Sequence, residues 1–358
     1  MKKHVLIYLV LLISLAYAGD RIDCDPEMYN HLPQNFIETA TFASGGQYVL
    51  SGHRDLYVRL WDIKTAQLLK SFNHGPLNWG LRVAISPDNK TIVSSGYKCN
   101  KSVTKFWNIE TETMRKKIPT FSEVLTFSPC GKFVLTEAKS NLNIWDSKTG
   151  LLENKIVVDQ LNTFEKFFNK SIGTIANKMF EKRTDRIRDI VVSSNKQFIA
   201  CAIGKVIKLF QFNNVEDTFE FRGHTENITK IVLSRDINLL ASGSDHRLNG
   251  SDTAFLLLKI WNLQERILER NLYLNNKYMS PIQTLRFTPD GKQICVGLWN
   301  KTIIIFDIHS GELFKIVHLK VRPYVFSFDC NFFLSVGNKL EVFETFSGKY
   351  VKTLWRAN

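Results

Sequence analysis

The sequence predicts an all-β fold built from seven copies of a four-stranded antiparallel unit, and two repeated features carry this prediction. The first is a tight turn between two stretches in which apolar residues alternate with period two. The second is a large aromatic residue that ends the third strand of each copy. Both are clearest in residues 126–150, where the turn is Ser128–Gly131 and the third strand ends at Trp145-Asp146. A fourth strand follows a Lys-Thr-Gly turn.

The same order of turn and aromatic residue recurs along the chain. The other turns begin at Ser44, Ser86, Ser193, Ser234, Thr288 and Ser327. The other third strands end at Trp61, Trp107, Phe210, Trp261, Phe306 and Phe343, with Asp62 after the first of them. On these residues the chain resembles the WD-repeat family of β-propellers from Phe36 onward. The resemblance implies a seven-bladed β-propeller, in which sheets that cannot bury both faces alone cover one another around an axis.

The resemblance also implies a hydrogen-bonded set inside a regular blade: a His before the first strand, a Ser or Thr on the second strand, an Asp in the next turn and the Trp of the third strand. The fifth repeat offers His224, Ser242, Asp245 and Trp261 for these places. The second repeat has His74, Ser94 and Trp107 but no obvious Asp. We therefore expect His224 to be structural rather than a ligand or a catalytic base. Structural roles are also expected for Trp61, Asp62, Trp107, Trp145 and Asp146.

The N-terminus has the pattern of a secretory signal peptide over residues 1–18, with Lys2 and Lys3 before an apolar run and a small-residue pattern at its end. Residues 19–35 contain two prolines and no period, so they are expected to form an extended lead-in to a propeller spanning 36–358. The mature chain has no other stretch that is apolar enough to span a bilayer. These features predict a secreted, periplasmic or lumenal protein.

Six cysteines accompany this predicted export. Cys201 and Cys295 fall on second strands and are expected to be small buried hydrophobes. Cys24 and Cys99 are the two that could pair in an oxidising compartment. The spacing contains no Cys-x-x-Cys, so no metal site is predicted.

One segment breaks the repeat between the third and fourth blades. In residues 159–185, apolar side chains recur at three- and four-residue steps, which predicts an amphipathic helical insertion. The stripe consists of Leu161, Phe164, Phe167, Phe168, Ile172, Ile175, Met179 and Phe180. Gly173 weakens its middle, so two shorter helices are an alternative. The stripe could pack on the propeller, dock a partner or lie on a membrane surface.

The formal net charge of +13 suggests an anionic partner, such as an acidic glycan, a lipid surface or an acidic protein. A lysine-rich surface that keeps the protein soluble explains the charge equally well. The lysines are scattered and form no dense run, so a nucleic acid is not the expected partner. The chain shows no phosphate loop, nucleophile elbow, zinc-binding helix or dinucleotide fingerprint, so neither catalysis nor a cofactor is predicted.

Sequence insertions point to one face. The stretches 97–102, 159–185 and 245–254 all follow a second or fourth strand, and such connections emerge on one rim of a propeller. Aromatic and cationic residues suited to anchor a partner are expected on that rim. These candidates are Trp79, Arg82, Tyr97, Arg247, Trp299, Arg322 and Tyr324. The predicted function is a non-catalytic protein-interaction scaffold; the alternatives are a module for acidic glycans or membrane surfaces, and a propeller hydrolase.

Overall fold

Seven four-stranded sheets form the part of the chain that a computed structural model describes. That part comprises residues 36–75, 79–98, 101–138, 141–157, 187–195, 197–211, 218–244, 255–274 and 280–356. The chain divides into two units, Met1–Gln34 and Asn35–Asn358, and every described residue belongs to the second. The predicted signal peptide, the lead-in, the insertion at 159–185, Asp245, Arg247, Cys24 and Cys99 lie outside the described residues.

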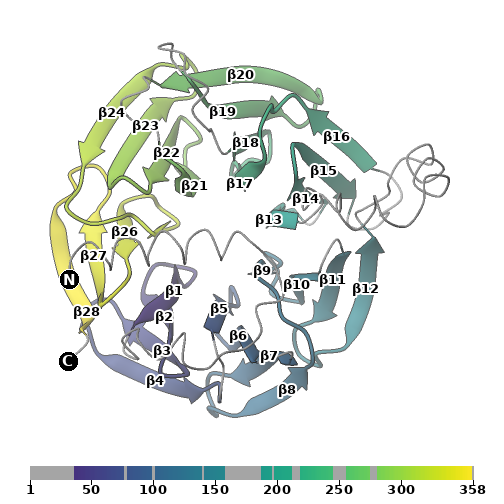
Figure 1. Ribbon diagram of the computed structural model, residues 1–358, viewed down its shortest axis with the longest axis vertical. Coiled ribbons are helices and arrows are strands. Elements are labelled where there is room, and N and C mark those ends of the chain that lie inside the picture. Colours follow the sequence, from purple (N-terminus) through teal and green to yellow (C-terminus); the bar gives the residue numbers. More distant parts are fainter. Residues whose placement is uncertain are drawn as a thin grey trace, which may run out of the picture. The chain divides into compact units, whose positions relative to one another are not determined.

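Each sheet contains four strands that follow one another in the chain and pair antiparallel in that order. The sheets are arranged in a ring, with the first strand of each sheet innermost (Figure 1). In chain order the strands are β1 Ile37–Phe42, β2 Tyr48–His53, β3 Tyr57–Asp62, β4 Leu68–Asn73; β5 Trp79–Ile85, β6 Thr91–Lys98, β7 Lys101–Asn108, β8 Met114–Ile118; β9 Leu125–Phe127, β10 Phe133–Ala138, β11 Asn141–Asp146, β12 Leu152–Val157; β13 Ile187–Val192, β14 Phe198–Ile203, β15 Val206–Gln211, β16 Thr218–Arg222; β17 Ile228–Leu233, β18 Leu239–Ser244, β19 Phe255–Asn262, β20 Ile267–Leu274; β21 Ile282–Phe287, β22 Gln293–Leu298, β23 Thr302–Asp307, β24 Leu313–His318; and β25 Val325–Phe326, β26 Phe332–Ser335, β27 Lys339–Glu344, β28 Tyr350–Arg356. The prediction of seven blades is confirmed.

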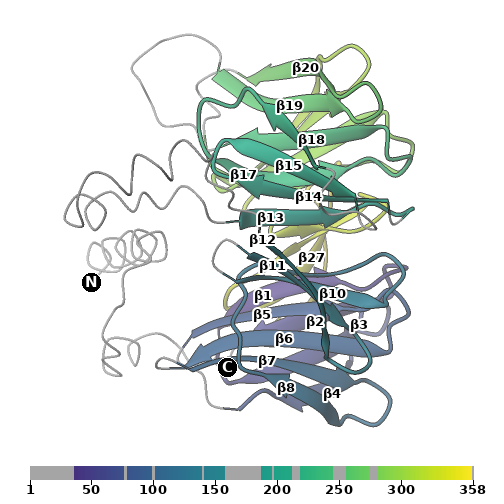
Figure 2. The ribbon, with the colours of Figure 1, turned by 90° about the vertical axis from the view of Figure 1, so that its right-hand side faces the viewer.

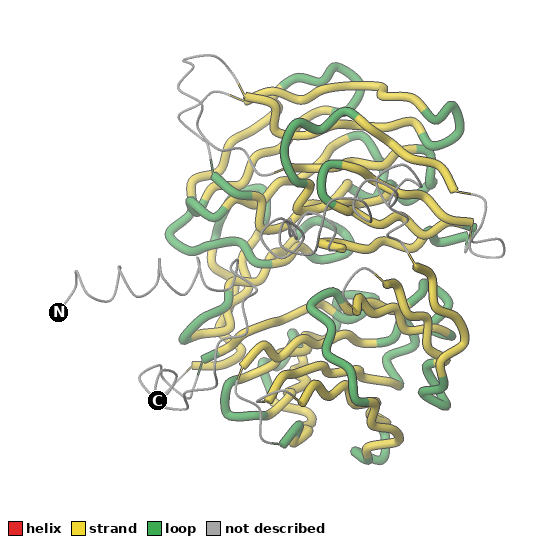
Figure 3. The backbone as a smooth tube through the Cα atoms, turned by 45° about the vertical axis from the view of Figure 1, so that its right-hand side comes forward, coloured by secondary structure: helices red, strands yellow, loops and turns green. Residues whose placement is uncertain are grey.

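Strands and the turns between them account for all of the described residues, which include no helix (Figure 3). The predicted helical insertion between the third and fourth blades therefore has no support in the described part of the chain. In the same part, no helix is long and apolar enough to cross a membrane.

In six of the seven blades, the turn after the inner strand is built around one hydroxyl group; in the first blade Ala43 stands at this place. Ser86 Oγ donates to Asp88 Oδ1 at 2.6 Å and accepts the backbone N–H of Thr91 at 2.9 Å. The same pair of bonds recurs in the last four blades, at Ser193, Ser234, Thr288 and Ser327. A short polar side chain that bonds to its own backbone favours such a tight turn, so this local chemistry explains why the motif marks these hairpins.

A second hydroxyl group lies at the centre of four blades. The indole Nε1 of Trp61, Trp107, Trp145 and Trp261 donates to Ser51, Ser94, Thr136 and Ser242, each at 2.8 Å. In the fifth blade His224 Nε2 lies 2.6 Å from Ser242 Oγ, so three of the four expected members meet. In the second blade His74 Nδ1 lies 2.6 Å from Ser94 Oγ. The buried indole thus has the hydrogen-bond partner it needs.

The first blade obtains its histidine from a different place. His53 Nε2 bonds Ser51 Oγ at 2.7 Å, and both residues lie on β2, two positions apart and hence on one face of the strand. Its ring also contacts Trp355 of β28 edge to face, with the ring centroids 4.8 Å apart. His53 was not predicted from the sequence, because the repeat pattern places the histidine before the first strand.

The Asp of each Trp-Asp pair shapes the outer turn. Asp62 Oδ1 accepts the backbone N–H of Thr65 at 2.7 Å and its hydroxyl at 3.0 Å. Asp146 accepts the same two bonds from Thr149, at 2.8 and 2.9 Å. The hydrogen bond from the Thr65 backbone is the main factor that lowers the pKa of Asp62. One oxygen of each carboxylate is therefore occupied within its own turn.

The hydrophobic core lies between the sheets. Its buried residues form seven clusters, and each cluster joins two neighbouring blades. Cys201 and Cys295 are fully buried members of two of them. Because every cluster takes residues from two sheets, no blade has a core of its own.

The ring closes between the first and seventh blades, a junction that we call the seam. In the described part of the chain, no strand is shared across it, because β1–β4 and β25–β28 each form a complete sheet. Ile37 and Phe42 pack against Leu340 and Val342. The backbone N–H of Ile37 donates to the carbonyl of Gly337 at 3.0 Å. Packing, supplemented by a few hydrogen bonds, therefore closes the ring.

Replacing the central hydroxyl should weaken a blade. In Ser94→Ala the indole of Trp107 and the ring of His74 both lose their shared partner inside the core. We expect the free energy of unfolding to fall by about 1–3 kcal/mol, measured by urea denaturation. Ser347→Ala removes an exposed serine and should change it little. Equal values for the two variants would contradict the structural role of Ser94.

Acid should destabilise the protein through its buried histidines. Burial lowers the pKa of His53 and of His74 from the usual 6.5 to about 3. The unfolded chain then takes up protons below pH 6.5 that the folded chain does not take up until about pH 3. The contribution of these histidines to the free energy of unfolding is therefore fully present above pH 6.5. It is lost as the pH falls, by about 1.4 kcal/mol per pH unit for each histidine.

This pH dependence can be measured from urea denaturation between pH 6 and 4. His74→Gln should reduce the slope of the free energy of unfolding against pH by about 1.4 kcal/mol per pH unit, which corresponds to one proton. His309→Gln, which removes an exposed histidine, should leave that slope unchanged. Identical slopes in wild type and His74→Gln would show that His74 does not contribute.

Candidate functional site

The candidate site is the rim at which inner strands begin and second strands end, which we call the upper rim. Strand register defines it: Ile37 pairs with His53, Trp79 with Tyr97, Ile228 with Ser244 and Ile282 with Leu298. Figure 2 shows the blades from the side, with their two rims at opposite ends of the strands. The strand ends that flank residues 158–186 and 245–254 lie on the upper rim.

The stretch at residues 97–102 is not the enlarged loop that the sequence suggested. Tyr97 pairs with Ser102 and Lys98 with Lys101, so these residues extend the hairpin of β6 and β7. The polar sequence Tyr-Lys-Cys-Asn-Lys-Ser resembles a loop in composition, but its register continues the antiparallel ladder. The second blade therefore differs from its neighbours in strand length at this rim.

Two of the predicted contact residues meet between the sixth and seventh blades. The guanidinium of Arg322 lies over the ring of Trp299, 4.4 Å from its centroid. Trp299 follows β22 and is half-buried, whereas Arg322 precedes β25 and is exposed. A cation over an indole face holds both side chains in place and leaves the outer side of the guanidinium accessible to a partner.

A chain of contacts continues from this pair across the seam. Tyr324, half-buried two residues after Arg322, donates from its hydroxyl to the backbone carbonyl of Glu38 at 3.2 Å. The Glu38 carboxylate accepts Nε of Arg54 at 3.1 Å and the backbone N–H of Leu81 at 2.7 Å. Neither Glu38 nor Arg54 was predicted from the sequence, because no local pattern shows that Glu38 meets Leu81 in the next blade.

The remaining predicted contact residues are less open or lie outside the described part. Arg82 is half-buried on β5, and its guanidinium donates to the neighbouring carbonyl of Leu81 at 3.3 Å. Tyr97 packs edge to face on Phe121, with centroids 6.1 Å apart. Trp79 begins β5, but its side chain and all of Arg247 lie outside the described residues. The structure therefore joins Trp299, Arg322 and Tyr324 and leaves Arg82 and Tyr97 apart from them.

A second inner-strand carboxylate bonds to the next blade. Asp189 of β13 accepts the backbone N–H of Ile231 in β17 at 2.9 Å. Burial raises the pKa of Asp189, and the nearby Lys230 opposes this rise. Among the described residues, no three His, Cys, Asp or Glu side chains come together as a metal site would require. Glu38 and Asp189 both bond to backbone N–H groups, which is a structural use of a carboxylate.

Comparison with known proteins supports the repeat assignment. Residues 24–62, 216–249 and 275–307 match the WD40 family model, described as WD domain, G-beta repeat. The chain is 23% identical to a putative BTB/POZ domain and WD-repeat protein R61 of Acanthamoeba polyphaga mimivirus, over 81% of this chain and 68% of that protein. It is 20% identical to autophagy-related protein 16 of Arabidopsis thaliana, over 82% of this chain and 52% of that protein.

A third relative is a WD repeat domain-containing protein 83 homolog of Dictyostelium discoideum, which is 20% identical over 63% of this chain and 83% of the relative. The chain therefore contains WD40 repeats and folds as a seven-bladed propeller, an architecture typical of protein-interaction scaffolds. Because the chain spans about half of the Arabidopsis protein and about two thirds of the viral one, the activities of those whole proteins do not transfer to it.

Proposed function

We propose that the protein is a non-catalytic interaction scaffold that binds a protein partner on the upper rim. The observation that carries the proposal is the stacked pair of Trp299 and Arg322. Tryptophan and arginine contribute more to interface energies than most residues, particularly where neighbouring contacts preorganise them. This pair lies at the junction of two blades, and the contact of Tyr324 with Glu38 continues along the rim.

The arrangement of the described residues supports a scaffold in two further ways. The inner-strand carboxylates Glu38 and Asp189 are bonded to backbone N–H groups of neighbouring blades. The buried histidines His53 and His74 are bonded to serines, and their lowered pKa values keep them neutral near pH 7. These groups hold the blades together, and the rim between them presents a rigid surface.

The charge of the chain keeps an anionic surface as the second candidate partner. The salt dependence of binding distinguishes a protein partner from an anionic surface. Attraction between exposed charges weakens strongly as ionic strength rises, whereas a desolvated aromatic and arginine contact persists. Binding to vesicles of acidic lipid or to heparin that disappears by about 0.5 M salt would identify a charge-driven surface.

The double variant Trp299→Ala/Arg322→Ala should lose partner binding. Each truncation removes one half of the stacked pair. At about 2 kcal/mol for each anchor, we expect affinity to fall by about 1,000-fold in total. The measurement is quantitative affinity capture with purified wild-type and variant protein, followed by titration of each captured partner.

The matched control is Phe314→Ala, which removes an exposed aromatic side chain from β24, away from the upper rim. It should retain every partner that wild type captures at high salt. Melting temperatures must agree among the three proteins. Equal capture by the double variant and wild type would reject the upper rim as the binding face.

A further inference from the structure

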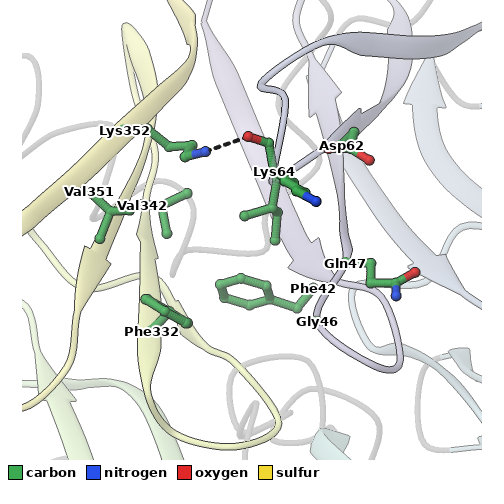
Figure 4. Close-up of a pocket in the computed structure, with 10 residues that line it drawn as sticks. Phe42, Gly46, Gln47, Asp62, Lys64, Phe332, Val342, Val351 and Lys352 are labelled. Atoms are coloured by element: carbon green, nitrogen blue, oxygen red, sulfur yellow. Dashed lines mark hydrogen bonds between the residues drawn. The ribbon is translucent and has the colours of Figure 1, made fainter.

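A cavity of about 490 Å³ opens at the seam, on the rim opposite the long connections. Its walls come from the turns at Gly46-Gln47 and Asp62–Lys64 of the first blade and from β26–β28 of the seventh. The apolar side chains on it are Phe42, Ile63, Phe332, Val342 and Val351. Figure 4 shows the Phe42 and Phe332 rings below and the Lys64 and Lys352 side chains above. The volume is within the range of about 300–1,000 Å³ typical of binding pockets.

The charge at the seam differs from that of an equivalent junction. Lys352 of β28 pairs in register with Val342, as Lys70 of β4 pairs with Leu60. Each lysine donates to a carbonyl in the outer turn of the next blade: Lys352 Nζ to Lys64 at 2.8 Å, and Lys70 Nζ to Glu110 at 3.1 Å. Arg270 makes the same kind of bond to His309 and Ser310.

The lysine at the junction of the first and second blades forms a close ion pair, whereas the described residues include no such pair for the lysine at the seam. Lys70 forms an ion pair with Glu112 at 3.1 Å. In the turn at the seam, Lys64 stands where Glu110 stands, and Ala66 stands where Glu112 stands. Asp62 lies near Lys352, but its Oδ1 accepts two bonds from Thr65. No described carboxylate lies within 4 Å of the ammonium of Lys64 or Lys352. Two cations and the carboxylate of Asp62 therefore border a cavity whose walls are largely apolar.

We propose that the seam cavity binds an acidic peptide segment of a partner protein, with one aromatic or aliphatic side chain in the cavity and flanking carboxylates against Lys64 and Lys352. The apolar walls favour a peptide over a free anion, because a free anion would leave Phe42, Phe332 and Val342 uncovered. The two lysines favour carboxylates beside the anchor, since these complete the ion pair that Glu112 supplies at the neighbouring junction.

This site is separate from the proposed binding face. It lies at the other end of the strands from Trp299 and Arg322, and it is formed by turns that follow inner and third strands. A partner at the seam would contact the first and seventh blades together and so reinforce a junction that is closed by packing and a few hydrogen bonds.

Fluorescence anisotropy with labelled peptides tests the proposal. The probes are GSEDXEDGS peptides with Phe, Leu or Trp at X, titrated with the full chain at 50 and 150 mM salt. At least one should bind. Replacing X by Ser, or the acidic residues by their amides, should each weaken binding by at least about tenfold, because the first removes the apolar anchor and the second removes the carboxylates.

Lys64→Glu should weaken binding by at least about tenfold, since charge reversal replaces attraction by repulsion. The matched control is Lys148→Glu. Lys148 occupies the same place in the outer turn of the third blade and is also exposed. Its substitution by Glu changes the net charge by the same amount as Lys64→Glu. This variant should bind the probe as wild type does. Val351→Ser, at the exposed edge of the cavity, should weaken binding of the peptide without changing the charge of the protein.

Four results would overturn the proposal: no binding by any probe, equal losses in Lys64→Glu and Lys148→Glu, equal binding of the Ser-containing peptide, or competition by inorganic phosphate as strong as by the unlabelled peptide. The second would show attraction by net charge alone, and the third would show an anion site without an apolar anchor. Competition of that strength by inorganic phosphate would likewise show an anion site without an apolar anchor. The Trp299→Ala/Arg322→Ala variant should bind the probe normally, so failure of the upper-rim proposal is distinguishable from failure of this one.

Discussion

Every feature of this propeller depends on one packing constraint: a four-stranded sheet with strands of about six residues cannot bury both faces alone. Each of the seven core clusters lies between two sheets, so the core of a blade is supplied in part by its neighbour. Stability is consequently a property of junctions more than of individual blades. Polar groups also bond across junctions: Glu38 accepts the N–H of Leu81, and Asp189 accepts that of Ile231. These directional hydrogen bonds orient each sheet against the next.

Inside four blades, one hydroxyl group accepts the hydrogen bond that a buried indole N–H would otherwise lack. Ser51, Ser94, Thr136 and Ser242 each accept that N–H, and three of them also bond a histidine. The blades that end their third strand in Phe210, Phe306 or Phe343 have no N–H to satisfy. The aromatic ring fills the same space in both cases, so the loss of the indole changes the polar chemistry and preserves the fold.

Local chemistry made the number of blades, the turns and the ends of the third strands predictable from the sequence. Ser86 and its equivalents bond within five residues, and Asp62 and Asp146 bond within three, so their signals appear in a short window. The hairpin at residues 97–102 was misjudged because polar composition conceals a continued strand register. The contact of Tyr324 with Glu38 and the seam cavity join residues almost 300 positions apart, and no local pattern encodes them.

The seam also determines the order in which the molecule can be completed. Neighbouring blades elsewhere follow one another along the chain, so each can stack on the one before it as synthesis proceeds. The first blade, in contrast, meets its second neighbour only after β28 has left the ribosome. Until then Ile37, Phe42 and Val49 lack their packing partners Leu340 and Val342. A nascent chain paused before the last blade is thus an open arc with an exposed apolar end, the species that a chaperone would have to protect.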